Sequence, residues 1–374
     1  MIIGIDASRA FLKQRTGIEE YSYQVIKHLA DRQTSLTKET SDCQVVLYLR
    51  KNQEIDFILP KNWNARVIQW PRFWTQIGLS LEMIFHPVDT LFIPAHTVPV
   101  VHSKNTIVTI HGLEYEFCPK AYSPWETFYM RWSIKNSCRW AKKIIAVSNN
   151  TKQDLIKLYK VPENKIEVIY EGYGSIGKSQ IQNPKSQINT KYQTLNTKYL
   201  LFIGRLEERK NIIGIIKAFE ILKEHYKIPH KLILAGKFGY GEQEIRHELE
   251  NINCSKSIIL SGYVSEEEKW ELLKSADIFL FPTFYEGFGL PVLEAQSLGV
   301  PVVAGNNSSI PEIAGDSALL VDSTNAEEMA DEIKRLIYDE NLKNDIIKKG
   351  YENVKRFSWD KCAREIAELI NTNG

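Results

Sequence analysis

The residues best suited to carry chemistry run from Glu286 to Glu294. The two glutamates have seven residues between them, and Gly287 and Gly289 follow the first glutamate closely. Carboxylates accept hydrogen bonds, so both are suited to bind the hydroxyl groups of a ligand. The glycines, which flank Phe288, allow a ligand to approach the backbone closely.

The surrounding pattern predicts a strand, a loop and a helix. Apart from Asp277, residues 276–281 are apolar, and Pro282 follows them, as in a buried strand. From Leu290 the pattern is helical, with Pro291 in the first turn and an end at Gly299. The start of a helix carries unpaired N–H groups and a partial positive charge, which suit a phosphate. We therefore expect a ligand with phosphates and sugar hydroxyls.

A second candidate site follows a predicted strand at 199–203. Gly204 and Arg205 come directly after it, and Lys210 precedes a predicted helix. Arginine binds two oxygens in a fixed fork and lysine acts as a compact charge, so this pair is suited to a pyrophosphate. The alternative interpretation is a pair of solvated surface cations.

Two features of the first half also stand at strand ends. The predicted strand 107–110 ends directly at His111, and ligands of open α/β sheets collect at the carboxyl ends of strands. The other seven histidines are interpreted as structural or surface residues. The predicted strand 2–5 leads to Gly17 and then to a helical spacing from Tyr21. This first strand-loop-helix unit lacks the G-x-G-x-x-G string, so a hydride-transfer function loses its main support.

Composition describes an ordinary globular protein. The 374 residues fit two domains, and a net charge of +1 does not favour nucleic acid as a partner. Five scattered cysteines without a C-x-x-C pair predict a reducing cytosol and no metal site. The beginning of the sequence predicts no secretory signal, and no apolar run is long enough to span a membrane. We expect a cytoplasmic protein.

Alternating strand and helix patterns in both halves predict two doubly wound α/β domains. We expect a first domain at 1–174 and a second at 199–356. The linker between them, 175–198, has four lysines and no acidic residue. A last helix follows at 357–374.

The string EGFGLPVLE at 286–294 resembles the donor-site motif of retaining glycosyltransferases of family 4, also called glycosyltransferase group 1. This family includes many bacterial α-mannosyltransferases. The resemblance implies a GT-B fold, with two Rossmann-like domains facing each other across a cleft, and a last helix that crosses back to the first domain. It also implies that Arg205 and Lys210 bind the donor pyrophosphate together with the amides of 288–290. Glu294 would bind the ribose and Glu286 the donor sugar.

Further roles follow from the same resemblance. His111 would lie near the reacting sugar, and the catalytic residues would be His111, Arg205, Lys210 and Glu286. The implied donor-binding set also includes loop residues of both domains, namely Gly17, Gly204, Gly236, Tyr263, Val264, Gly287, Phe288, Gly289 and Leu290. The sequence departs from the family at two places. Glu19-Glu20 replaces Gly-Arg, and Glu171-Gly172-Tyr173 replaces Asn-Gly-Val.

The implied activity is transfer of a sugar from a nucleotide diphosphate to a hydroxyl of a growing, lipid-linked or oligosaccharide, bacterial surface glycan such as lipopolysaccharide. GDP-mannose is the first expectation for the donor and a UDP-sugar the second. No metal or other cofactor is expected, because protein cations would offset the charge of the leaving diphosphate. The alternatives are a sugar-nucleotide epimerase of similar architecture and a non-catalytic scaffold of glycan assembly.

Residues 122–143 form a predicted helical stretch in which aromatic and basic side chains alternate. Such a helix can lie on anionic lipid, which would place the protein peripherally on the inner face of the cytoplasmic membrane. The more common arrangement packs the aromatic side chains into the core and leaves the charges in solvent.

Overall fold

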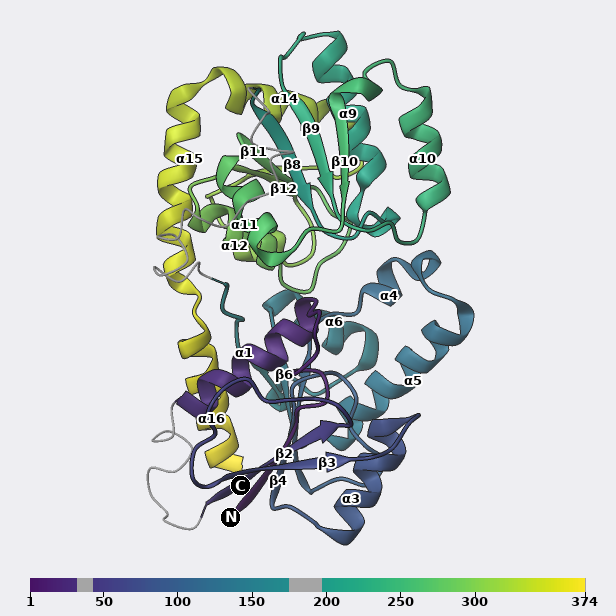
Figure 1. Cartoon of the computed structure of the whole chain (residues 1–374), viewed down its shortest axis with the longest axis vertical. Coiled ribbons are helices and arrows are strands. Elements are labelled where there is room, and N and C mark those ends of the chain that lie inside the picture. Colours follow the sequence, from purple (N-terminus) through teal and green to yellow (C-terminus); the bar gives the residue numbers. More distant parts are fainter. Residues whose placement is uncertain (32–42, 175–196, 374) are drawn as a thin grey trace. The chain divides into compact units, whose positions relative to one another are not determined.

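The computed structural model describes residues 1–31, 43–174 and 197–373, shown in Figure 1. They form two compact units. Unit 1 comprises 1–113, 124–172 and 357–374, and unit 2 comprises 114–123 and 173–356. The segment 114–123 lies inside the predicted first domain but groups with unit 2. Most of the predicted linker at 175–198 lies outside the described residues.

Unit 1 contains a seven-stranded parallel sheet in the order β3-β2-β1-β4-β5-β6-β7. The chain order reverses between β1 and β4, as in a doubly wound sheet. The strands are β1 (Ile2–Asp6), β2 (Gln44–Arg50), β3 (Trp63–Ile68), β4 (Thr90–Ile93), β5 (Asn105–Ile110), β6 (Lys143–Ala146) and β7 (Ile166–Val168). The helices are α1 (Gly17–Asp31), η1 (Trp74–Leu79), α3 (Ser80–Phe85), α5 (Pro124–Trp140), α6 (Asn149–Tyr159), η3 (Glu163–Lys165) and α16 (Trp359–Asn373).

The last helix, α16, belongs to unit 1 and packs against α1. Its inward face consists of small and apolar side chains that are fully buried, namely Cys362, Ala363, Ile366, Ala367 and Ile370. The first residue of α16, Trp359, lies so close to Gly172 that a Cβ atom on Gly172 would overlap the Trp359 backbone. The place where the chain leaves unit 1 and the place where it returns are therefore packed together.

Unit 2 contains a six-stranded parallel sheet in the order β10-β9-β8-β11-β12-β13. The strands are β8 (Tyr199–Ile203), β9 (Lys231–Ala235), β10 (Ile258–Gly262), β11 (Ile278–Phe281), β12 (Val302–Gly305) and β13 (Leu319–Val321). The helices are α4 (Glu114–Phe117), η2 (Pro119–Ala121), η4 (Glu208–Lys210), α9 (Ile212–Glu224), α10 (Glu242–Asn251), η5 (Ser255–Ser257), α11 (Glu266–Ser275), α12 (Leu290–Ser297), α13 (Ile310–Ala314), α14 (Ala326–Tyr338), α15 (Glu340–Asn353) and η6 (Val354–Arg356). The two parallel sheets confirm the predicted α/β class.

The helical stretch at 122–143 differs from its prediction. The helix α5 occupies only Pro124–Trp140, and Lys143 already begins β6. The side chains of Trp125, Phe128 and Trp132 are 69%, 60% and 40% exposed. Packing of these aromatic side chains into the core, the more common arrangement, is therefore wrong for the first half of the helix. No helix among the described residues is long and apolar enough to cross a bilayer.

Candidate active site

The loop between β11 and α12 is fixed by backbone contacts from the next strand-to-helix connection. The Ser309 hydroxyl donates to the carbonyl oxygens of Glu286 and Phe288 at 3.0 and 2.6 Å, and the Glu286 amide donates to Ser308 Oγ at 3.0 Å. Gly289 caps α12 with a φ of 118°, a conformation that glycine adopts without strain. As predicted, Pro291 lies in the first turn of this helix. These contacts hold the loop in one conformation.

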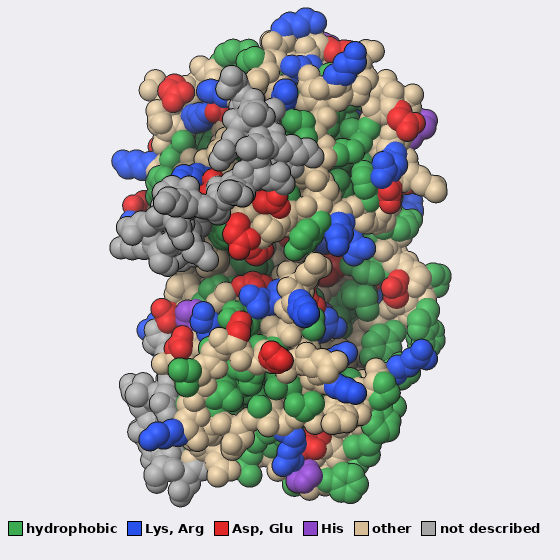
Figure 2. All heavy atoms as spheres, in the orientation of Figure 1, with side chains coloured by type: hydrophobic (Ala, Val, Ile, Leu, Met, Phe, Trp, Pro, Cys, Tyr) green, Lys and Arg blue, Asp and Glu red, His purple; other side chains and the backbone are tan. Residues whose placement is uncertain are grey.

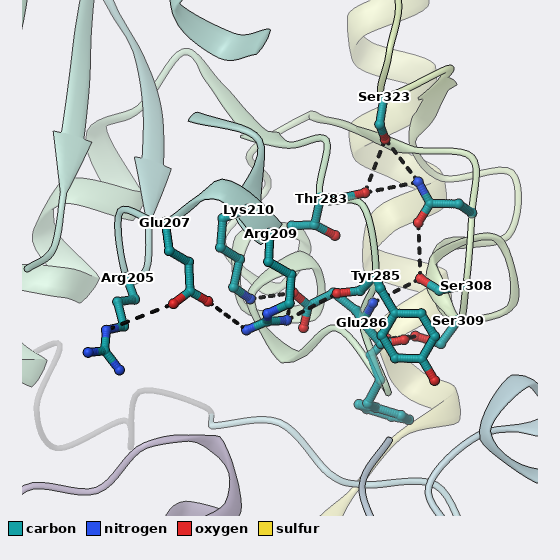
Figure 3. A network of polar contacts seen from close by, with 12 residues as sticks. Arg205, Glu207, Arg209, Lys210, Thr283, Tyr285, Glu286, Ser308, Ser309 and Ser323 are labelled. Atoms are coloured by element: carbon teal, nitrogen blue, oxygen red, sulfur yellow. Dashed lines mark hydrogen bonds and ion pairs between the residues drawn. The ribbon is translucent and has the colours of Figure 1, made fainter. Parts of the chain in front are cut away.

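The carboxylate of Glu286 accepts hydrogen bonds from two buried cations (Figure 3). Lys210 Nζ donates to Oε1, and Arg209 Nη1 donates to the same oxygen at 3.1 Å. Arg209 also contacts the Tyr285 carbonyl at 3.1 Å and Glu207 at 2.9 Å. Burial alone would raise the pKa of Glu286, but Lys210 and Arg209 hold it below its ordinary value. Glu286 is therefore a buried carboxylate ion.

The two predicted cations lie in different surroundings. Burial lowers the pKa of Lys210, although the charge of Glu286 opposes this effect. By contrast, the Arg205 side chain is 68% exposed, and its Nε lies 3.9 Å from a Glu207 oxygen (Figure 3). Lys210 is thus brought into direct contact with Glu286, whereas Arg205 is open to solvent at the end of β8.

The ends of β8 and β9 approach each other closely. Gly204 and Gly236 have φ angles of 153° and 145°, and a Cβ atom on Gly236 would overlap the Gly204 carbonyl oxygen. The predicted nucleotide loop after β10 includes Tyr263, whose side chain is 54% exposed. The centre of its ring lies 4.9 Å from Lys237 Nζ. Val264 beside it is half-buried. These loops all follow the carboxyl ends of strands in unit 2.

Glu294 is held by a second lysine. Lys269 Nζ on α11 donates to Glu294 Oε1 at 2.9 Å and lies 3.0 Å from Glu266. Burial alone would lower the pKa of Lys269, but the charges of Glu294 and Glu266 raise it above its ordinary value. The Nζ also lies 4.8 Å from the centre of the Trp270 ring. The predicted ribose-binding carboxylate is therefore already oriented.

In unit 1, His111 follows β5 directly and is almost fully buried. Its Nδ1 lies 3.1 Å from Glu171 Oε1, and its Nε2 lies 2.8 Å from the Pro94 carbonyl oxygen. Gly17 begins α1, and no atom lies within 4 Å of the position of an added Cβ. His111 and Gly17 therefore belong to unit 1, whereas the other predicted site residues belong to unit 2.

Comparisons with known proteins match both halves of the chain. The family model "Glycosyl transferases group 1" matches residues 185–353, and "Glycosyltransferase Family 4" matches 15–173. The O-antigen chain mannosyltransferase B of Escherichia coli is 31% identical over 267 residues, which cover 70% of this chain and 69% of that protein. The chain belongs to glycosyltransferase family 4, also called glycosyltransferase group 1.

Two further similarities agree with this assignment. The glycosyltransferase is 26% identical to the O-antigen chain mannosyltransferase RfbU of Salmonella typhimurium, over 83% of this chain and 81% of the relative. Its fold matches the solved structure of WaaG, a glycosyltransferase involved in lipopolysaccharide biosynthesis, with a TM-score of 0.71, 15% identity and 99% of both chains covered. It also matches HepE of Anabaena in complex with UDP and glucose, with a TM-score of 0.71, 17% identity and 99% of both chains covered. The GT-B fold is thereby confirmed.

The sequence analysis missed two cations of this glycosyltransferase. Arg209 stands next to Lys210 and was not singled out, because the G-R-x4-K spacing drew attention to the two ends of the string. Lys269 occupies the fourth position of α11, and its contact with Glu294, which lies 25 residues later in the sequence, joins two helices. Among the described residues, no group of three or more His, Cys, Asp or Glu side chains could hold a metal ion.

The glycosyltransferase site also includes a segment that sequence reasoning placed elsewhere. The ring of Phe117 on α4 stacks on Tyr285 with centroids 4.5 Å apart and planes at 12°. Burial alone would lower the pKa of Arg209, but Glu286 and then Glu114 raise it above its ordinary value. The segment 114–123 thus contributes a ring that stacks on Tyr285 and a carboxylate whose charge acts on Arg209. The arrangement presents cations, helix N–H groups and carboxylates to one region of unit 2.

Proposed function

We propose that this glycosyltransferase is a retaining enzyme that transfers mannose from GDP-mannose to a hydroxyl of a growing, lipid-linked bacterial surface glycan. The observation that carries this proposal is the buried contact of Glu286 with Lys210 and Arg209, beside the capped start of α12. Cations and helix N–H groups bind phosphates, and carboxylates bind hydroxyls. The site therefore has groups suited to both the diphosphate and the sugars of a nucleotide sugar. The names of the two mannosyltransferase relatives support the choice of sugar.

The reaction breaks the bond between C1 of the sugar and the diphosphate oxygen. The acceptor hydroxyl forms its bond to C1 on the same face, and its proton leaves with the diphosphate. Lys210, Arg205 and the amides at 288–290 would offset the negative charge that builds on the leaving oxygens, and such preorganised stabilisation is often a large part of catalysis. Glu286 would bind sugar hydroxyls and is not assigned as a covalent nucleophile.

A UDP-sugar is the second candidate donor, supported by the similarity of the fold to HepE, which was solved with UDP and glucose. A panel of labelled nucleotide sugars, each with and without a lipid-linked acceptor, tests the proposal. We expect labelled lipid-linked product from GDP-mannose only, with retention at the anomeric carbon. Product formed only from a UDP-sugar would show that the donor is this UDP-sugar and not GDP-mannose. Conversion of the donor without acceptor would indicate the epimerase, and no turnover of any donor would indicate the scaffold.

We further propose that α5 docks the enzyme on anionic lipid. Its exposed aromatic residues, Trp125, Phe128 and Trp132, recur at intervals of three and four residues and so share one face. The exposed basic residues are Arg131, Lys135 and Arg139. Figure 2 shows hydrophobic side chains and Lys or Arg side chains together over this helix. Aromatic and basic side chains together favour the interface of an anionic bilayer.

Sedimentation with phosphatidylglycerol vesicles tests this docking. We expect binding that grows with the anionic fraction and falls with salt. The double variant Trp125→Ser, Phe128→Ser should lose most of it. The matched control is Tyr338→Ser, because Tyr338 is 63% exposed on a helix of unit 2. Absence of wild-type binding at low salt would overturn the proposal, as would equal binding by the double variant.

A further inference from the structure

His111 is placed between two hydrogen-bonding partners that come from different parts of unit 1. Pro94 follows β4, and Glu171 comes three residues after β7 ends. The His111 ring contacts the Pro94 carbonyl oxygen through Nε2 at 2.8 Å and the Glu171 carboxyl through Nδ1 at 3.1 Å. The side chains of His111 and Glu171 are only 9% and 5% exposed. Both contacts are therefore shielded from water.

The donors and acceptors of these contacts fix the number of protons. A carbonyl oxygen only accepts, so Nε2 must carry a proton that it donates to Pro94. A carboxylate also only accepts, so Nδ1 must then carry a second proton. The alternative is a neutral ring whose Nδ1 accepts from a protonated Glu171. The charged arrangement is favoured, because a hydrogen bond from an imidazolium to a carboxylate is charge-assisted and stronger than one between neutral groups.

We propose that Glu171 is a positioning residue that keeps both ring nitrogens of His111 protonated and holds the ring in one orientation. The charge of the imidazolium is balanced by the carboxylate, so the buried pair is neutral as a whole. Such a ring has no free lone pair. Both N–H groups are already donated to Pro94 and Glu171, so His111 serves the reaction as a fixed ring and not as a general base. This role concerns sugar transfer and so rests on the proposed function.

Burial favours the neutral forms of Tyr21, Cys362 and His96 around the pair, and Arg9 has the same sign of charge as the ring, which leaves Glu171 to compensate the ring. The Tyr21 ring meets His111 edge-on at 4.5 Å, and burial raises the pKa of the Tyr21 hydroxyl well above its ordinary value. Burial raises the pKa of the Cys362 thiol in the same way. The His96 ring lies 5.6 Å from His111, and burial, then the charges of His111 and Arg9, hold the pKa of His96 well below its ordinary value.

The position of Glu171 in the chain connects the pair to the crossing between the units. The next residue is Gly172, which packs against Trp359 where the chain returns to unit 1. Tyr21 contacts both sides, because its ring lies 4.5 Å from His111 and 5.9 Å from Trp359. A movement of the chain at Gly172 or Trp359 would therefore alter the hydrogen bond between Glu171 and the His111 ring.

The variant Glu171→Gln tests the proposal with little change of shape. The amide of glutamine can donate to Nδ1, so a neutral His111 ring then satisfies every contact. Nuclear magnetic resonance of the enzyme labelled with ¹⁵N-histidine reports the protons on each ring nitrogen, and His111→Gln identifies the signals. At pH of about 7 to 8 we expect two protonated nitrogens in the wild type and one in Glu171→Gln. The matched control is Glu167→Gln, because Glu167 is 48% exposed and pairs with Lys143.

The kinetic expectation is a lower kcat and an altered pH profile in Glu171→Gln, with the donor KM changed by less than about twofold. One protonated nitrogen in the wild-type His111 ring would overturn the proposal, as would a Glu171→Gln ring identical to that of the wild type. Loss of the two-proton ring in Glu171→Gln without any kinetic effect would overturn the positioning role. Failure of the wild type to transfer any sugar would instead refute the proposed function, because the resonance measurement needs no substrate.

Discussion

Lys269 Nζ lies 2.9 Å from Glu294 Oε1, and both side chains are largely buried, at 17% and 13% exposure. The two residues belong to neighbouring helices, α11 and α12. The ion pair fixes the carboxylate of Glu294 before any ligand binds. Because an oriented acceptor loses little freedom on binding, we expect Lys269 to raise nucleotide affinity through Glu294, without touching the nucleotide itself.

We predict that Lys269→Met weakens binding of the nucleotide diphosphate about tenfold, which corresponds to about 1.4 kcal/mol. Methionine keeps the length of the side chain and removes the charge, so Glu294 loses its orienting partner. Calorimetric titration with GDP and UDP measures the effect. Lys274→Met is the control, because Lys274 lies exposed on the same helix. Equal affinity in the two variants would contradict the role of Lys269.

Arg205 and Lys210 should both support turnover, but only Lys210 should also contribute to the stability of the folded protein. We predict that each alanine variant loses about 10- to 100-fold or more in kcat/KM, because a charge-assisted contact is worth about 1.5–3 kcal/mol. Lys210→Ala should also lower the free energy of unfolding by about 3–5 kcal/mol, since it leaves Glu286 buried with one partner fewer. Arg205→Ala should leave it unchanged, because Arg205 is 68% exposed.

Initial rates and urea unfolding measure these effects. Lys217→Ala, an exposed residue of α9, provides the control for both variants. Wild-type rates in Arg205→Ala and Lys210→Ala together would remove both residues from the pyrophosphate site. Unchanged stability in Lys210→Ala would mean that the buried ion pair is not maintained in solution.

Activity should not depend on a divalent metal. The prediction rests on the cations Arg205, Arg209 and Lys210, which lie in one unit with the start of α12 and can offset the charge of the diphosphate. Full transfer activity is expected after dialysis against excess chelator. A loss of activity that magnesium or manganese restores would show that the protein cations are not sufficient.

The fold was predictable because its signals are local. Serine is a residue type that favours the start of a helix, and Ser148 and Ser265 do cap α6 and α11 through their side chains. The helix signal at 122–143 located α5 but could not show which side packs inward, since that depends on neighbours far away in sequence. The strand β3 was missed because its burial pattern, with Trp63 buried and the next four residues exposed, does not alternate.

A cluster around Asp277 should make stability depend on pH. Asp277 accepts hydrogen bonds from Lys343 at 2.7 Å and from His230 at 3.0 Å. Burial alone would raise the pKa of Asp277, but these bonds hold it below its ordinary value. A depressed pKa contributes stability above the unfolded value, about 3.9, and this stability is lost as the pH falls through the folded value.

Asp277→Asn should therefore be less stable than the wild type by about 1–3 kcal/mol near pH 7, and the difference should shrink below about pH 4. Urea unfolding over this pH range measures it. Asp316→Asn serves as the control, because the Asp316 side chain is 84% exposed in its pair with Lys349. A difference that stays constant with pH would show that the effect is not the ionisation of Asp277.

We also predict that binding of a nucleotide diphosphate shifts the enzyme toward a closed form. In the proposed assignment, Lys210, Glu286 and Glu294 belong to unit 2 and His111 and Gly17 to unit 1, so we expect transfer to require both units. Small-angle scattering with GDP or UDP, a donor analogue and an acceptor should show a smaller radius of gyration. No change at saturation would mean that the two units do not close.

The candidate site was predictable only in part. The motif residues stand where strands end and helices begin, and Glu286 and Glu294 are recognisable from their fixed spacing. Their partners are not, because Lys269 and Arg209 reach them through the packing of separate elements. The contact of His111 with Glu171 joins residues 60 positions apart, and only the departure from Asn-Gly-Val marked that position as unusual.

The burial of α16 in unit 1 determines the order in which the protein can fold during synthesis. The residues up to Gly172 leave the ribosome first, but the surface that covers Ile366 and Ile370 in the finished unit stays bare until the chain has passed through unit 2. At about 5–20 residues per second, this delay is on the order of ten to forty seconds. Unit 2 has its own complete core and can fold within that time. The half of the enzyme that is made first is thus the half that is finished last, and its apolar surface stays open while unit 2 is synthesised.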